Sequence, residues 1–263
     1  MTTAFTAMRV IQNGERDRSR DSRGDPGRFQ GCVEYFDRHI GALFEAVERL
    51  GLAEKTLVIV AVDHGVQGLR CKGALYDHGT EIALMMQMPG TLEKGMRVDH
   101  LVQNIDLVPT ILQAAGIAVP GTVQGTSLWP ALSGGSYQPH REIFTEFSYH
   151  VDYQPERSIR TPDFHYIRFF SKNRMRHRTK PEVMALLNSG KRDWLKNWWA
   201  RVIPSSQTEE LYDVRQAPHE WRNLADKPEY AAVKADLRRR LVRWTHDTND
   251  PLLKGPIPEP ESD

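Results

Sequence analysis

The sequence predicts an α/β fold, and three features of its first half carry that prediction. Residues 57–62 form an unbroken, mostly β-branched apolar run, as expected of a strand buried on both faces of a parallel sheet. Residues 29–50 repeat apolar side chains at three- and four-residue steps, which is typical of a helix with one buried face. A second apolar run at 82–88 ends at a Pro-Gly pair and predicts another buried strand. Helix, strand, loop and strand in this order favour an α/β unit.

Shorter elements follow this unit. A helix is expected over 106–115, with Asp106 as its N-cap. Strands at 142–147 and 164–170 have aromatic and β-branched character and are separated by turns, which predicts a small antiparallel sheet. A helix is expected around 182–199, and an apolar stripe over 230–244 predicts a closing helix on the small sheet.

We therefore expect four regions along the chain. Residues 1–28 form a poorly ordered start, because interleaved charges cannot bury enough surface to offset their ordering entropy. Residues 29–140 hold the α/β part and residues 141–250 a small α+β subdomain. The proline-rich tail at 251–263 is expected to be loose.

The composition excludes several classes of partner. A net charge of +1, from 35 basic and 34 acidic residues, produces no overall field for nucleic acid or an anionic membrane. No apolar run reaches the roughly 18 residues of a spanning helix, and the first residues lack the layout of a secretory signal. Cys32 and Cys71 lie on unrelated elements and are expected to be free thiols, so the compartment stays unknown.

Polar candidates begin where the first strand ends. Asp63 and His64 follow the buried run directly, and ligands bind at the carboxyl ends of strands in open α/β sheets. A carboxylate is a hard oxygen ligand that suits a metal, whereas imidazole is an unusual calcium ligand. The alternative interpretation is structural, with Asp63 capping the following turn and His64 hydrogen-bonded.

A glycine-punctuated loop follows, and it contains Lys72 nine residues after Asp63. The spacing would allow the ammonium to lie over a tetrahedral anion held by a metal, where it would stabilise negative charge on the non-bridging oxygens. The alternative is an ordinary surface lysine. Asp77 and His78 are expected to be hydrogen-bonding loop residues rather than catalysts.

Several motifs together resemble the second half of formylglycine-dependent sulfatases. The order and spacing of these motifs match over roughly residues 29–250, and the ending is similar to the heparan N-sulfatase (sulfamidase) branch. The motifs are Tyr35-Phe-Asp-Arg-His-Ile-Gly, Val62-Asp-His-Gly, Lys72-Gly-Ala-Leu-Tyr-Asp-His-Gly-Thr, Asp106-Leu-Val-Pro-Thr-Ile-Leu, Glu210-Leu-Tyr-Asp and Trp244-Thr-His-Asp-Thr-Asn-Asp-Pro.

The resemblance implies a fold and a set of site residues. The fold is an alkaline-phosphatase-like α/β sandwich with a mostly parallel sheet, truncated at its N-terminus, plus a small C-terminal antiparallel sheet and closing helix. Asp63 and His64 would occupy two positions of the Ca²⁺ site, of which this chain would hold half. Lys72 would be the catalytic cation that contacts the sulfate, and His150 would lie near the substrate pocket.

The resemblance also implies an activity, which is the hydrolysis of a sulfuric ester or sulfamate on a sulfated small molecule or glycan. Members of this family are often periplasmic, secreted or lysosomal. The family's nucleophile is a formylglycine made within a Cys/Ser-x-Pro/Ala-x-Arg motif, and this sequence contains no such motif. We therefore expect a C-terminal fragment that is inactive alone, with the formylglycine in an N-terminal half.

Two other functions remain open at this point. A phosphatase or phosphodiesterase of the same superfamily would use the same metal and cation, because phosphate is also a tetrahedral anion. A catalytically dead module that binds an anionic glycan would use the basic segment 172–180.

Overall fold

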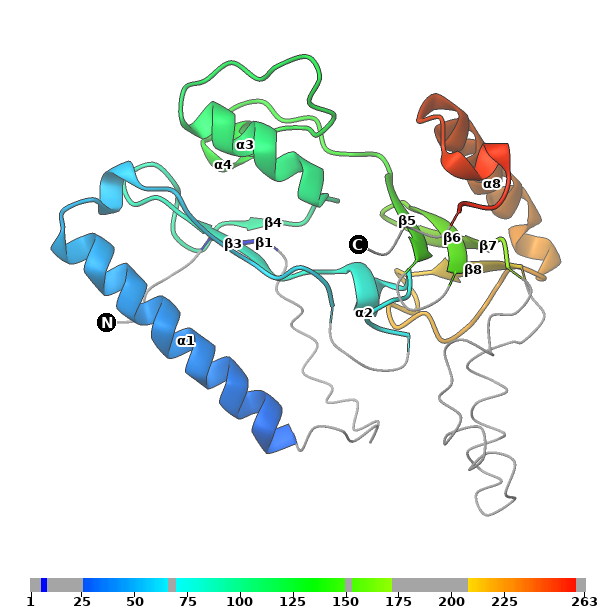
Figure 1. The fold of residues 1–263 in the computed structure, drawn as a ribbon, viewed down its shortest axis with the longest axis horizontal. Coiled ribbons are helices and arrows are strands. Elements are labelled where there is room, and N and C mark those ends of the chain that lie inside the picture. The colour runs from blue at the N-terminus through cyan, green and yellow to red at the C-terminus, as the bar shows by residue number, and fades with distance from the viewer. Residues whose placement is uncertain (1–5, 9–25, 66–69, 150–152, 172–207, 259–263) are drawn as a thin grey trace. The chain divides into compact units, whose positions relative to one another are not determined.

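The computed structural model describes residues 6–8, 26–65, 70–149, 153–171 and 208–258. The chain divides into two compact units (Figure 1). Unit 1 comprises residues 1–69 and 81–140, and unit 2 comprises residues 70–80 and 141–263. Among the described helices, none combines the length and the apolarity needed to cross a membrane.

The first elements of unit 1 confirm the helix and the two strands predicted from the sequence. Helix α1 spans Pro26–Arg49 and is followed by a short 3₁₀ turn, Ala53–Lys55. Strand β2 spans Val58–Ala61 and strand β3 spans Leu84–Gln87. Gly51 has φ +67, the left-handed conformation that ends a helix without a Cβ clash.

The described sheet of unit 1 differs from the expected parallel arrangement. Its order is β2-β3-β1-β4, with β1 at Thr6–Met8 and β4 at Arg97–Val98. The pairs β2/β3 and β1/β3 are antiparallel, and β1/β4 is parallel. Apolarity predicts that a strand is buried but carries no information about its direction, and the long link between β2 and β3 permits either direction.

Two further helices complete the core of unit 1. Helix α3 spans Leu107–Ala114 and helix α4 spans Trp129–Leu132. Buried side chains from the sheet and from α4 pack together, with Leu107 and Trp129 packed against them. The buried members of this cluster are Leu84, Met86, Leu92, Val98, Leu128 and Leu132.

Asp106 is the N-cap residue of α3, as predicted, but its side chain has a different role. Its side chain makes no cap hydrogen bond to α3. The fully buried carboxylate accepts hydrogen bonds from the backbone N–H groups of Gln103, at 2.8 Å, and Thr126, at 2.7 Å, and contacts Nε2 of His140 at 2.9 Å. The Asp106 side chain therefore joins three segments of unit 1 instead of capping one helix.

Unit 2 is built on a four-stranded antiparallel sheet, as predicted. Its strands pair in chain order, β5 at Ile143–Tyr149, β6 at Tyr153–Arg160, β7 at Phe164–Phe169 and β8 at Glu209–Asp213. The strands β5 and β7 match the predicted ones, whereas β6 and β8 were not anticipated. The helix expected at 182–199 lies outside the described residues.

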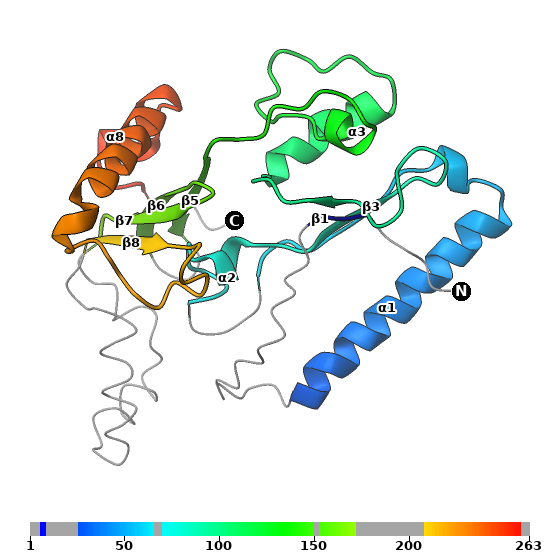
Figure 2. The ribbon, with the colours of Figure 1, turned by 180° about the vertical axis from the view of Figure 1, so that it is seen from behind.

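Two different layers cover the two faces of this sheet. Helix α8, Ala231–Asp247, lies across one face (Figure 2), where Leu237 and Leu241 pack against Ile159, Tyr166 and Leu211. It confirms the predicted closing helix. The opposite face packs on the segment Arg70–Thr80, with Ala74, Leu75 and Tyr76 against Ile167, Phe169, Tyr212 and Val214. The alternation of side chains along β7 explains why Tyr166 and Ile167 belong to different clusters.

Candidate functional site

The first candidate pair lies in unit 1, just past the end of β2. The Asp63 side chain is 84% exposed. Its Oδ1 accepts a hydrogen bond from the backbone N–H of His64 at 3.0 Å, and Nε2 of His64 lies 3.3 Å from Oδ2. The other ring nitrogen of His64 is 2.8 Å from the carbonyl oxygen of Gly65. The strand end therefore presents an accessible carboxylate, held by its neighbour, to a ligand.

The donor set of this pair fits a calcium ion in part. An exposed carboxylate is the hard oxygen ligand that Ca²⁺ takes, and the ion requires about six to eight such donors. His64 fits less well, because imidazole suits borderline transition metals and its nitrogens already face Asp63 and Gly65. Asp63 is therefore the residue of this pair that would hold the ion, with further oxygen donors from other segments.

The second candidate, Lys72, lies in the segment Arg70–Thr80 of unit 2 and its side chain is exposed. Arg70, two residues earlier, is buried. Its guanidinium carbon lies 3.7 Å from the centre of the Tyr76 ring and 5.3 Å from that of Tyr212, and Nη2 donates a hydrogen bond to the carbonyl oxygen of Glu220 at 2.5 Å. Cation–π contacts of this kind stabilise a buried guanidinium, so Arg70 fixes the chain immediately before Lys72.

The buried carboxylate of Glu210 binds the two tyrosines that contact Arg70. The hydroxyls of Tyr76 and Tyr212 both donate to Oε2 of Glu210, each at 2.7 Å. Burial and the adjacent Glu210 charge raise the pKa of Tyr212, so that hydroxyl stays a donor. Burial alone would lower the pKa of Arg70, but Tyr76, Tyr212 and Glu210 outweigh it and raise that pKa. The cluster therefore keeps one cation and one carboxylate apart from water.

A third group of charges anchors the chain after Lys72. The backbone N–H of Asp77 donates to Oε2 of Glu220 at 2.7 Å, and Oε1 of Glu220 lies 2.5 Å from Nδ1 of His165. Arg160 donates to the Asp77 carboxylate from Nε and Nη2 at 3.0 to 3.2 Å. Asp77 is thus the hydrogen-bonding residue predicted from the sequence. Glu220 and His165 were missed, because 143 residues separate Asp77 from Glu220.

Asp77, His165 and Glu220 also form a candidate metal centre by geometry, since one ligand atom from each lies within 4.8 Å of the others. Hydrogen bonds already occupy these atoms, and the Arg160 cation contacts both oxygens of Asp77. A divalent ion would have to displace that guanidinium. The cluster is therefore better explained as a buried ion-pair network than as a metal centre. In such a network each charged group offsets the desolvation cost of its partner, so every partner must be present.

Lys72 therefore lies on a segment that is anchored on both sides. Both ends of the loop are fixed to the small sheet, Gly73 takes φ +77, and a Cβ at Gly79 would collide with the backbone oxygen of Cys71. The predicted convergence of Lys72 with Asp63 stays a prediction, because the two residues belong to different units. His150 lies outside the described residues.

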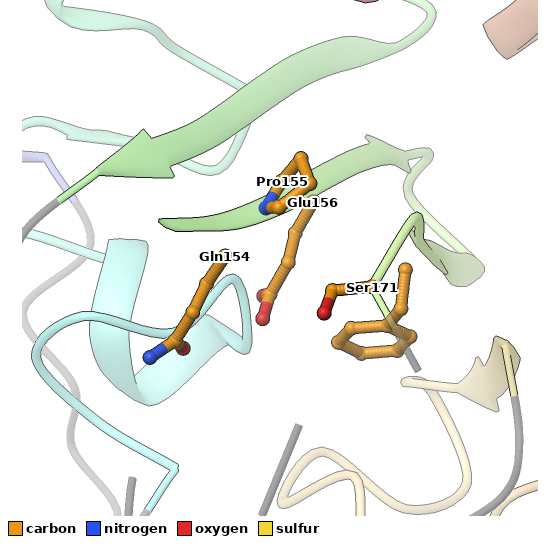
Figure 3. A pocket seen from close by; sticks show the side chains of 5 residues that line it. Gln154, Pro155, Glu156 and Ser171 are labelled. Carbon is orange, nitrogen blue, oxygen red and sulfur yellow. The ribbon is translucent and has the colours of Figure 1, made fainter. Parts of the chain in front are cut away.

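The third candidate is a narrow surface crevice of unit 2. It is lined by Gln154, Pro155, Glu156, Phe169 and Ser171 (Figure 3), and it leaves essentially no room for a water molecule. None of these residues was predicted to be functional. A crevice of this size does not hold a sugar, since small-molecule sites enclose at least a few hundred Å³.

Comparison with known families gives two matches that overlap along the chain. The model of the Sulfatase family matches residues 9–117. The model of the C-terminal part of N-sulphoglucosamine sulphohydrolase matches residues 65–179. The two matches include Asp63, His64 and Lys72, the residues that carry the predicted chemistry.

Curated proteins and solved structures agree with these matches. The chain is 28% identical to the human N-sulphoglucosamine sulphohydrolase over 261 residues, which cover 89% of this chain and 50% of that protein. A solved structure of a putative sulfatase from Bacteroides thetaiotaomicron superposes with a TM-score of 0.68 at 23% identity, covering 90% of this chain and 45% of that one. The phosphonate monoester hydrolase of Silicibacter pomeroyi gives a TM-score of 0.59 at 24% identity, covering 80% and 38%.

The first curated relatives are all longer than this chain, which spans between 35% and 50% of their lengths. The solved structures show the alkaline-phosphatase-like fold expected from the sequence, and the two matched models both describe sulfatases. The chain is therefore similar to sulfatases over residues 9–179, and from residue 65 onward it is similar to the C-terminal part of N-sulphoglucosamine sulphohydrolase.

Proposed function

We propose that this chain provides the cation-bearing part of a hydrolase that cleaves sulfuric esters or sulfamates on a sulfated sugar. The observation that carries the proposal is the placement of Lys72, an exposed ammonium on a segment fixed on both sides by buried charges. A cation carried on an anchored loop can be kept close to an oxyanion, the charge of which it stabilises. The matched family hydrolyses sulfate groups, and the human relative is named for a sulfated glucosamine.

Each residue has a defined role in this proposal. Lys72 donates hydrogen bonds to the non-bridging oxygens of the sulfate and balances the charge that builds up on them. Asp63 holds the calcium ion, which when bound supplies a Lewis acid for the sulfate. His64 holds the Asp63 carboxylate in position through its backbone N–H and ring. The Arg70 and Asp77 anchors keep the Lys72 loop in one conformation.

We further propose that this chain does not turn over substrate by itself. Its sequence contains no Cys/Ser-x-Pro/Ala-x-Arg motif, so it offers no site for a formylglycine nucleophile. Lys72 and Asp63 can bind a sulfate and a metal, but neither attacks sulfur. Binding and turnover are therefore separable in this chain, and each can be measured.

The first test is binding of glucosamine N-sulfate by isothermal titration calorimetry in the presence of calcium. We expect the K72A variant to lose at least tenfold in affinity, because a charge-assisted hydrogen bond contributes about 1.5 to 3 kcal/mol. Lys254→Ala, an exposed lysine elsewhere in unit 2, is the matched control and should bind normally. Equal affinity of K72A and the unmodified chain would contradict the proposed role of Lys72.

The same titration separates the alternatives. Loss of binding on neutralising Arg174, Arg176 and Arg178, with K72A unaffected, would favour a glycan-binding module. Tighter binding of phenylphosphonate than of phenyl sulfate would favour a phosphonate or phosphate hydrolase, the fold of which this chain shares. The second test is turnover of 4-nitrophenyl sulfate with calcium: we expect none, and robust turnover would contradict the inactivity of the isolated chain.

A further inference from the structure

Two histidines of unit 2 face each other at the edge of the buried network. His78 lies on the short helix α2, Asp77–Thr80, and His219 lies on the turn before Glu220. Nε2 of His78 and Nδ1 of His219 are 3.4 Å apart, and the two rings stack with their centres 5.5 Å apart and an angle of 17° between their planes. Both side chains are half-buried, so one side of the pair is open to solvent.

Hydrogen bonds anchor the backbone next to each of the two histidines. His78 follows Asp77 and His219 precedes Glu220, and the Asp77 N–H donates to the Glu220 carboxylate at 2.7 Å. Glu220 has φ +56, a conformation that costs energy for a residue with a side chain. Its carbonyl oxygen accepts from Arg70 and its carboxylate contacts His165, which hold it there. The two imidazoles are therefore positioned before any ligand arrives.

The separation of the two nitrogens matches a shared transition-metal ion. Two Zn–N bonds of about 2.0 to 2.1 Å at a tetrahedral angle place the nitrogens about 3.3 to 3.4 Å apart. The observed 3.4 Å is long for a hydrogen bond between two ring nitrogens. Within the described part of the chain, neither of these two nitrogens has another hydrogen-bond partner.

We propose that His78 and His219 form a binding site for a borderline divalent transition-metal ion such as Zn²⁺, Ni²⁺ or Cu²⁺, with water in the remaining positions. Imidazole nitrogens select these ions over Ca²⁺, which prefers oxygen donors. The site is distinct from the Asp63 candidate in unit 1 and from the Asp77, His165 and Glu220 cluster, the ligand atoms of which are already engaged. It does not depend on the proposed sulfate hydrolysis.

A bound ion would join the segment that carries Lys72 to the turn at Ala217–Glu220. Because an ion that binds the folded chain and not the unfolded chain stabilises the folded state, metal should raise the melting temperature of unit 2. Two protein ligands and no further His, Cys, Asp or Glu ligand within reach among the described residues predict micromolar rather than nanomolar affinity.

The test is titration of the purified chain with Zn²⁺ by calorimetry. We expect one micromolar site, and H78A and H219A should each weaken it at least tenfold. The double variant should bind no Zn²⁺ at this site, because the two side chains are its only protein ligands among the described residues. His246→Ala, an exposed histidine on α8, is the matched control and should leave the affinity unchanged. Millimolar Ca²⁺ should not compete.

Two additional measurements keep the test decisive if a variant folds poorly. Asn replacements, H78N and H219N, retain a polar side chain, and far-ultraviolet circular dichroism without metal verifies the fold of every variant. Electron paramagnetic resonance of the Cu²⁺-loaded chain counts the equatorial nitrogens. We expect two in the unmodified chain and one in each single variant. Zinc affinity that is equal in H78A, H219A and the unmodified chain, or a copper spectrum without two histidine nitrogens, would overturn the proposal.

Discussion

Helices α1 and α8 have similar sequence patterns but opposite environments. Both are amphipathic, and the apolar periodicity of each predicted a helix. On α8, Leu237 and Leu241 are 2% and 1% exposed, and Trp244 stacks on Phe144 with ring centres 5.0 Å apart. On α1, Val33 and Leu43 are 51% and 52% exposed.

The difference shows what periodicity can and cannot establish. Periodicity specifies which face of a helix should pack against another element, but it does not identify that element. The small sheet covers α8, whereas the described residues leave much of the α1 face open. Exposed apolar faces of this kind usually mark an interface.

The largest expected effect concerns the buried ion pair of unit 2. Arg157 donates from Nε and Nη2 to Asp250 at 2.6 and 2.9 Å, and both residues are almost fully buried. Asp250→Asn should cost about 3 to 5 kcal/mol, because it leaves a buried guanidinium without its charge partner. Urea denaturation checks this value. Glu146→Gln, which loses a 3.6 Å contact to the same Arg157 at an exposed position, should cost less than about 1 kcal/mol.

The same carboxylate predicts a pH dependence. Burial by itself would raise the pKa of Asp250, but hydrogen bonds from Arg157 and from the Leu252 N–H outweigh it and lower that pKa. The unfolded chain therefore binds a proton more readily than the folded chain, so stability rises with pH through this range. The contribution is complete above the ordinary Asp value of about 3.9 and is lost as pH falls through the lowered one. Asp250→Asn should flatten the acid side of the stability profile.

A matched pair of leucines sharpens the comparison of the two helices. Leu241→Ala on α8 should cost about 2 to 5 kcal/mol, since it leaves a cavity in a packed core. Leu43→Ala on α1 should change stability by no more than about 0.5 kcal/mol, because the side chain is half exposed. Hydrogen exchange resolved by peptide measures both. Equal costs would show that α1 is covered as fully as α8.

The exposed face of α1 should promote association of the chain. Replacing Phe36 and Leu43 together by Glu should reduce concentration-dependent association in sedimentation velocity, with little change in unfolding free energy, because both side chains are about half exposed. Glu45→Lys, an exposed position of the same helix, is the control. Unchanged association in the double variant would mean that this face makes no intermolecular contact.

The smallest effect distinguishes the two cysteines, which are free thiols as predicted. Cys32 is exposed on α1, whereas Cys71 is half-buried. Burial raises the pKa of Cys71, and the nearby Arg70 only partly opposes this, so less thiolate is available at neutral pH. Reaction with Ellman's reagent should be biphasic, and Cys32→Ser should remove the fast phase. Loss of the slow phase instead would reverse the assignment.

The elements that could be predicted are those with a regular apolar pattern, which is continuous in the strands of unit 1 and periodic in the helices. Helix α1, strands β2 and β3 and helix α8 all carry such patterns. Strands β6 and β8 were missed because buried charges interrupt them, as with Arg157 and Glu210. From sequence alone, a charged residue is assigned to the surface unless its partner is known. The partner of Arg157 is Asp250, which lies 93 residues away in the sequence.

The candidate site also contains residues that the sequence predicts and residues that it does not. Asp63 and Lys72 could be predicted because each lies in a local sequence pattern. Asp63 follows the end of a strand, and Lys72 lies in a glycine-rich loop. The contacts that anchor the Lys72 loop could not be predicted, because Arg70 and Asp77 both donate hydrogen bonds to Glu220, which lies on a turn far away in the sequence. The pairing of His78 with His219 depends on the same long-range contact.

The most direct test of the account is a double-mutant cycle on calcium-dependent binding of glucosamine N-sulfate, using D63N, K72A and the combined variant. If Asp63, through the calcium ion, and Lys72, by direct contact, act on one sulfate, each single variant should abolish most of the binding and the double variant should lose little more. Strictly additive losses, or sulfate binding that is indifferent to calcium and to Asp63, would show that the two residues serve separate sites.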